Sequence, residues 1–90
     1  MLPNGHDEQE LRRLARTALN QGLIPRDRPR GLWGGNGSGE TCPVCGIPVD
    51  AAEMELEVEF GIAEVSAQGV REFHLHLPCF AAWEIERRTG

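Results

Sequence analysis

Three cysteines and one histidine are spaced along this 90-residue chain in a way that leaves few folds open to it. Cys42 and Cys45 form a C-P-V-C-G motif, and Cys79 ends an H-L-H-L-P-C motif. An odd number of cysteines cannot all pair as disulfides within one molecule. A Cys-x-x-Cys turn followed by glycine instead aims two sulfurs at one point, and zinc binds four nitrogen or sulfur ligands in a tetrahedron. The pattern C-x2-C-x30-H-x2-C predicts one structural zinc ion per chain, bound by Cys42, Cys45, His76 and Cys79.

His74 is the alternative to His76 as the fourth ligand. If residues 70–76 form a strand, both histidines point to the same face, so geometry alone does not exclude His74. We favour His76, because it stands one turn before Cys79 as the chain enters a helix. His74 is then expected beside the site or on the surface, paired with a carboxylate. We expect His6 to be exposed to solvent and to have no role in metal binding.

Residues 7–21 are predicted to form an amphipathic helix. Asp7 and Glu10 resemble a capping box, and acidic residues suit the positive end of the helix dipole. Gly22 is a plausible C-cap, and Pro25 prevents continuation. A helical period places one apolar stripe on the helix, opposite Arg12, Arg13 and Arg16. The stripe consists of Leu11, Leu14, Ala15, Ala18 and Leu19.

Residues 25–41 contain two prolines and five glycines with little periodicity, which is typical of a loop or linker. Leu32 and Trp33 are the exceptions within it. We expect Trp33 to pack on the core of the protein itself, and contact with a partner is the alternative.

Apolar residues alternate with glutamates over residues 53–60, which predicts a strand from Met54 to Phe60. The glutamates at 53, 55, 57 and 59 are expected on the face opposite the apolar residues. The chain is expected to stay extended to residue 65, to turn at 66–69 and to return over 70–75 as an antiparallel partner. Pro78 suits the first turn of a last helix that ends by Gly90. The fold class is therefore α+β: an N-terminal helix (residues 1–24), a linker (25–41) and a zinc-finger domain (42–90).

The order of Cys-x-x-Cys turn, hairpin and helix resembles the treble-clef group of zinc fingers. The segments CPVCGIPV and FHLHLPCFAAW are most similar to the fingers of poly(ADP-ribose) polymerases, with the LIM domain as a second relative, and the similarity covers residues 42–84. The resemblance implies the same four ligands and places Phe80 in the core under the site. It does not extend to DNA-break recognition, because residues 40–90 hold ten acidic residues and three arginines, a net charge of −7. The ligands of a second LIM zinc site are also missing. The chain is similar, too, to small bacterial proteins with a helix ahead of such a finger.

Composition narrows the function classes further. All nine basic residues are arginine, so the chain has no lysine. This excludes Walker-type phosphate loops and Schiff-base chemistry, which both need a lysine. Neither Ser38 nor Ser66 stands in a G-x-S-x-G motif. Four protein ligands fill a zinc shell, whereas a catalytic zinc keeps one position open for water. We therefore expect no enzymatic activity.

No apolar run approaches the length of a membrane span, and the N-terminus lacks the order of a signal peptide. We therefore expect a cytoplasmic protein with no membrane association. The zinc-stabilised fold is expected to act as a protein–protein interaction or adaptor module, with another protein or a second copy as partner. The helix stripe is expected to dock within the chain.

The alternative function is nucleic-acid binding by residues 11–30, where six arginines stand against one acidic residue, Asp27. The net charge of −5 opposes a polyanionic partner. We favour pairing of these arginines with the acidic strand 53–59. A third alternative is a thiol redox switch, although zinc-bound thiolates are usually shielded from oxidation.

Overall fold

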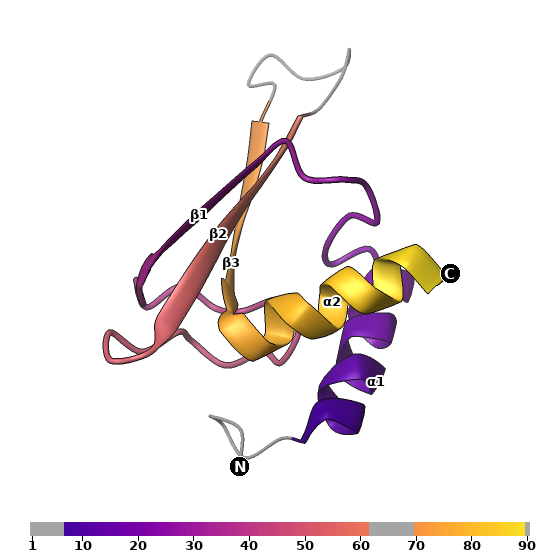
Figure 1. Cartoon of the computed structure of the whole chain (residues 1–90), viewed down its shortest axis with the longest axis horizontal. Coiled ribbons are helices and arrows are strands. Elements are labelled where there is room, and N and C mark those ends of the chain that lie inside the picture. The colour runs from indigo at the N-terminus through magenta and orange to yellow at the C-terminus, as the bar shows by residue number, and fades with distance from the viewer. Residues whose placement is uncertain (1–6, 62–69, 90) are drawn as a thin grey trace.

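The computed structural model describes residues 7–61 and 70–89 of the chain (Figure 1). The fold is α+β, as the sequence predicts, with two helices and a three-stranded antiparallel sheet. The expected turn at 66–69, His6 and Gly90 lie outside the described residues. In chain order the elements are α1 (Glu8–Asn20), β1 (Gly31–Asn36), β2 (Met54–Gly61), β3 (Val70–His76) and α2 (Leu77–Thr89).

Helix α1 begins and ends where its local sequence indicates. The Asp7 side chain accepts a hydrogen bond from the Glu10 amide, which caps the first turn. At the other end Gly22 adopts a positive φ of 74°. The Gly22 amide donates to the Leu19 carbonyl and the Leu23 amide to the Ala18 carbonyl, the two bonds of a Schellman motif.

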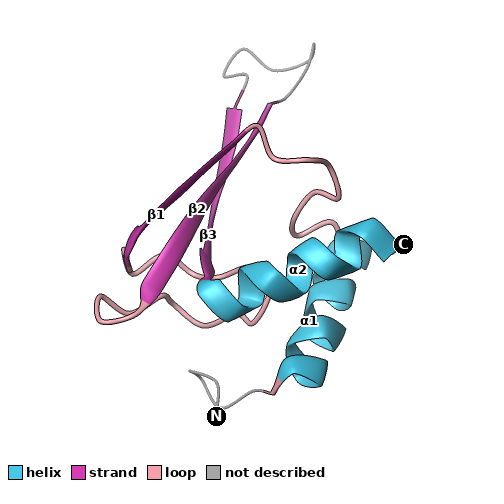
Figure 2. Ribbon diagram, viewed as in Figure 1, coloured by secondary structure: helices cyan, strands magenta, loops and turns pink. Residues whose placement is uncertain are grey.

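Helix α2 lies between the sheet and α1, as Figure 2 shows. Four of the five residues in the predicted apolar stripe of α1 are buried, and Leu14 is partly buried. Helix α1 packs against α2, which confirms the expected docking within the chain. On its other side, Trp83 of α2 meets Phe60 of β2 edge-on at a ring-centroid distance of 5.8 Å. The fully buried Trp83 ring also donates a hydrogen bond to the Pro25 carbonyl. The core is therefore continuous from α1 through α2 to the sheet.

The segment expected to be a loop contains a strand, so this part of the prediction is wrong. Residues 31–36 form β1, which pairs antiparallel with β2 along its whole length and lies at the edge of the sheet, in the order β1-β2-β3. Glycine-rich sequence has weak strand propensity, and pairing with a neighbouring strand overrides that weakness. Trp33 is also not in the core, because its side chain is 53% exposed. It lies over Gly31 of the same strand, where any side chain would collide with the indole ring.

Strand β2 only partly follows the predicted alternation. Val58 and Phe60 are buried as expected, but Met54, the first residue of the strand, is exposed. On the opposite face Glu55 is only 6% exposed. The Ser38 amide and hydroxyl both donate hydrogen bonds to its carboxylate. These hydrogen bonds replace those that water would make, and so they reduce the free-energy cost of burying the carboxylate.

Two arginines of α1 pair with α2 rather than with the acidic strand. Arg12 and Arg16 both bind the buried Glu86 carboxylate, at 2.7 and 3.2 Å. The hydrogen bond from Arg12 lowers the pKa of Glu86, with a further contribution from Arg16. Among the described residues, the strand 53–59 makes one arginine contact, between Arg30 and Glu59 at 3.9 Å. Ion pairs between the helices thus add to their apolar packing.

Candidate metal centre

The Cys-x-x-Cys turn is built by backbone hydrogen bonds. The Gly46 amide donates to the Cys42 carbonyl at 2.8 Å, and the Cys42 amide donates to the Ile47 carbonyl at 3.1 Å. Gly46 has a φ of +78°, a conformation that side chains disfavour, so this glycine lets the turn close. A single bridge between Thr41 and Pro48 closes the base of the turn.

The junction of β3 and α2 supplies the other two side chains. His76 is the last residue of β3, and Cys79 is the third residue of α2. Because the helix follows the strand without a connecting loop, the two side chains lie one helical turn apart. Helix α2 begins at Leu77, one residue before the expected position at Pro78.

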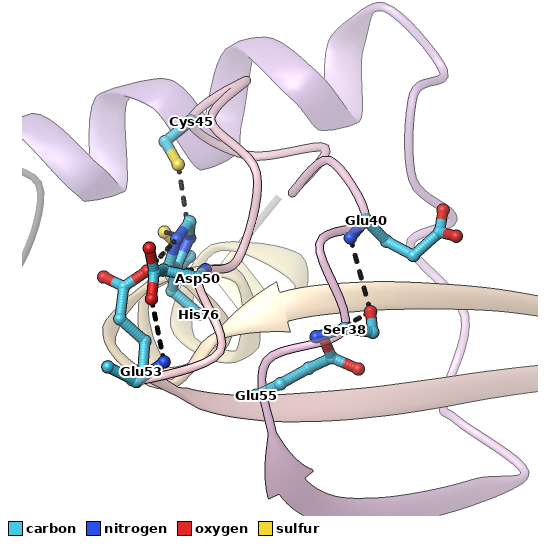
Figure 3. Close-up of polar contacts among 9 residues, drawn as sticks. Ser38, Glu40, Cys45, Asp50, Glu53, Glu55 and His76 are labelled. Atoms are coloured by element: carbon cyan, nitrogen blue, oxygen red, sulfur yellow. Dashed lines mark hydrogen bonds and ion pairs between the residues drawn. The ribbon is translucent and has the colours of Figure 1, made fainter.

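The structure brings together all four side chains predicted as ligands: Cys42, Cys45, His76 and Cys79. Their candidate ligand atoms all lie within 4.8 Å of one another. Nδ1 of His76 is 3.4 Å from the Cys45 sulfur and 3.7 Å from the Cys79 sulfur. Figure 3 marks the contact between His76 and Cys45 with a dashed line. In a tetrahedral zinc site, bonds of about 2.3 Å to sulfur and 2.05 Å to nitrogen place these atoms about 3.6 Å apart. Both nitrogen–sulfur distances are therefore compatible with a zinc ion bound by the cluster.

The cluster is largely closed to water. Cys42 and Cys79 are completely buried, and His76 is 1% exposed. Three thiols so close together cannot ionise independently. Hydrogen bonds with Cys42 and Cys79 lower the pKa of Cys45 to about 2, whereas the hydrogen bond with Cys45 raises the pKa of Cys42. The pKa of Cys79 is raised as well, first by its contact with Cys42. A divalent cation would stabilise all three thiolates at once.

The second ring nitrogen of His76 indicates that the cluster extends beyond four residues. Nε2 is buried and has no hydrogen-bond partner among the described residues. Glu53 Oε1 lies 3.4 Å away, with Asp50 beside it in Figure 3. Glu53 also accepts a hydrogen bond from the Asp50 amide at 2.9 Å, which holds its carboxylate near the imidazole. Metal-bound histidines commonly have such a carboxylate on the other nitrogen. The sequence does not reveal this contact, because Glu53 looks like one member of an acidic strand face.

His74, the alternative fourth ligand, is directed elsewhere. Its Nδ1 donates to the Glu55 carboxylate at 2.6 Å. Burial alone would lower the pKa of His74, but the Glu55 carboxylate more than offsets this and raises it. Burial opposes ionisation of Glu55 too, and hydrogen bonds from His74 and Ser38 lower its pKa. The structure thus pairs His74 with a carboxylate, as expected, and leaves His76 with the cysteines.

No helix among residues 7–61 and 70–89 has the length and apolar character needed to cross a membrane.

No protein-family model, curated protein or solved structure matches this chain. The similarity to treble-clef fingers therefore remains a prediction from the motifs, and the candidate site depends on its own geometry. That geometry is a buried cluster of three sulfurs and one imidazole, compatible with a zinc site.

Proposed function

We propose that this chain is a small zinc-binding protein whose single Cys3His site is structural. The convergence of Cys42, Cys45, His76 and Cys79 from two segments far apart in sequence is the observation that carries the proposal. Three soft thiolates and one imidazole favour zinc over harder cations. The ion would join the Cys-x-x-Cys turn to the junction of β3 and α2.

A catalytic role is not proposed, for three physical reasons. Four protein ligands complete the zinc shell and leave no position for water or substrate. Three thiolates also give the zinc centre a net charge of −1, which makes the metal a poor Lewis acid. Burial of Cys42, Cys79 and His76 further restricts access to the metal.

We further propose that the zinc-stabilised fold presents a protein-interaction surface at β1. Leu32 and Trp33 are about half exposed, at 48% and 53%, on a strand at the edge of the sheet. An edge strand has unpaired backbone N–H and C=O groups. An extended segment of another protein can form hydrogen bonds with these groups and so add a further strand to the sheet. Tryptophan is among the residues that most often anchor such interfaces.

Native mass spectrometry tests the metal proposal and the oligomeric state together. The as-isolated protein should contain one zinc per chain, and Cys42→Ser or Cys79→Ser should lose it. His74→Asn should keep it, since His74 is not directed at the cysteines. A metal-free but folded wild-type protein would contradict the proposal. The same spectrum shows whether the partner is a second copy of the chain.

The interaction surface needs a separate comparison. Proteins retained by the wild type from an extract of the source cell should be lost with Trp33→Ala and Leu32→Ala. Leu23→Ala is the matched control, since Leu23 is a similarly exposed leucine (51%) after α1. Equal retention by all variants would rule out β1 as the binding surface.

Nucleic-acid binding by residues 11–30 remains the alternative function. The structure supports it less than the number of arginines in this segment suggests. Arg12 and Arg16 are paired with Glu86, and Arg13 is paired with Glu10. These contacts partly neutralise the positive charge of α1. Binding of a random duplex that falls steeply with added salt would favour this alternative.

A further inference from the structure

A second group of potential metal ligands lies on the sheet, apart from the cysteines. Side-chain ligand atoms of Glu57, Glu72 and His74 all lie within 4.8 Å of one another. Glu57 is directly opposite His74 in the pairing of β2 with β3, and Glu72 precedes His74 by two residues on β3. Residues at these positions share one face of a sheet. The arrangement therefore brings two carboxylates and one imidazole to a common point.

The imidazole of this group is held in a fixed orientation. Its Nδ1 donates to Glu55 at 2.6 Å, and Glu55 is itself fixed by the Ser38 amide and hydroxyl at 2.8 and 2.7 Å. With Nδ1 occupied, Nε2 is the nitrogen that remains for a ligand. A carboxylate that fixes one nitrogen while the other binds a metal is a recurrent feature of metalloproteins. Glu55 thus holds His74 by a hydrogen bond, a closer contact than the 3.4 Å between Glu53 and His76.

The two carboxylates lack an arginine partner. Among residues 7–61 and 70–89, no arginine forms an ion pair with Glu57 or Glu72. The nearby arginine on β3, Arg71, lies over the Phe73 ring, 5.0 Å from its centroid. Two adjacent carboxylates repel each other unless a proton or a cation lies between them. A divalent cation would remove this repulsion.

The site is open to water along β1. A shallow pocket is lined by Glu55, Glu57 and His74 on one side and by β1 from Trp33 to Asn36 on the other. Gly35 is the register partner of Glu55, and a Cβ atom there would meet nothing within 4 Å. A cation held by three protein ligands could therefore complete its coordination with water molecules, as hard cations usually do.

We propose that Glu57, Glu72 and His74 form a second divalent-cation site, which takes an ion such as Mn²⁺ and is separate from the cysteine cluster. Two carboxylates and one imidazole suit a borderline or hard ion, whereas three thiolates select zinc. The same strand thus supplies His76 to the soft site and His74 to the hard one.

Manganese alone, added to the zinc-loaded full chain, is the probe. Electron paramagnetic resonance of free Mn²⁺ measures the affinity, and paramagnetic broadening of amide signals locates the ion. One Mn²⁺ should bind per chain and broaden signals around Glu57 and His74. The zinc content of the same sample should stay unchanged. Glu57→Gln and Glu72→Gln should each weaken binding by at least about tenfold, because loss of a direct ligand costs no less than loss of an outer-shell partner.

Glu59→Gln is the matched control, because Glu59 is two residues from Glu57 on the same face of β2 but outside the ligand group. It should weaken Mn²⁺ binding by less than about threefold. Because Glu72 is exposed, Glu72→Gln should keep the amide spectrum of the folded protein.

Three results would overturn the proposal. The first is no binding at about 1 mM Mn²⁺, the weakest range for protein sites of hard cations. The second is equal weakening by Glu59→Gln and Glu57→Gln, which would indicate only a diffuse acidic surface. The third is broadening centred on Cys45 with release of zinc. The zinc measurement itself separates failure of this proposal from failure of the Cys3His site.

Discussion

Removal of zinc should unfold the region around the cysteine cluster. Net stability of about 0.05–0.15 kcal/mol per residue gives this 90-residue chain about 5–13 kcal/mol. A structural zinc contributes about 10–16 kcal/mol of apparent binding free energy, which is as large as that whole margin. Without the ion, the side chains of Cys42, Cys79 and His76 would stay buried with no metal to bind their sulfur and nitrogen atoms.

Tryptophan fluorescence offers a local measurement of this unfolding. The chain has two tryptophans, so Trp33→Phe leaves Trp83 as the single reporter. Trp83 is fully buried four residues after Cys79 and is hydrogen-bonded to Pro25, so unfolding should shift its emission to longer wavelength. Chelator should be added until mass spectrometry shows no bound zinc. Far-ultraviolet circular dichroism then reports the loss of α2 and the sheet.

Restored zinc should bring both signals back, which separates unfolding from chemical damage. Unchanged circular dichroism and unchanged Trp83 emission in fully zinc-free protein would refute the reasoning. The continuous apolar core from α1 to the sheet would then be sufficient by itself, and zinc would be an addition to a fold that is already stable.

Glu53→Gln should weaken zinc binding between about tenfold and a hundredfold in competition with a chromophoric chelator, because His76 loses the carboxylate beside its Nε2. Glu86→Gln should lower the free energy of urea unfolding of the zinc-loaded protein by about 1–3 kcal/mol, since both paired arginines of α1 lose a charged acceptor. The folded pKa of Glu86 lies below its ordinary value of 4.5, so this contribution is present above about pH 4.5 and is lost as the pH falls through the folded pKa. Gly22→Ala should cost about 1–2 kcal/mol in the same unfolding assay, because alanine disfavours the positive φ at the end of α1.

Each of these variants has a control in which the same substitution is made at another position. Glu40→Gln is a control for the zinc affinity, because Glu40 is exposed and outside the cluster. Glu84→Gln removes only the pair with Arg87 on the same helix and should cost less than about 1 kcal/mol. Gly35→Ala introduces no clash and no positive φ. Equal effects of variant and control in any of the three comparisons would contradict the corresponding prediction.

Local sequence was sufficient for the elements whose signals lie within a few residues. Asp7 and Gly22 mark the ends of α1 through side-chain and backbone preferences that act within one turn. The cysteine spacing predicted which side chains form the candidate metal cluster for a similar reason, since each half of the cluster is a short motif. A Cys-x-x-Cys turn and an H-x-x-C segment each bring two ligands together locally.

Tertiary structure alone decided the features that depend on strand register and helix packing. Strand β1 has no clear local signal, and it exists because β2 supplies a partner for each of its residues. The pairing of Arg12 with Glu86 joins residues 74 positions apart. Register also places His74 opposite Glu57, which a count along the sequence does not reveal. Such contacts form only when distant segments are held at a fixed distance, so the amino-acid order specifies the candidates, and the packed chain determines which of them meet.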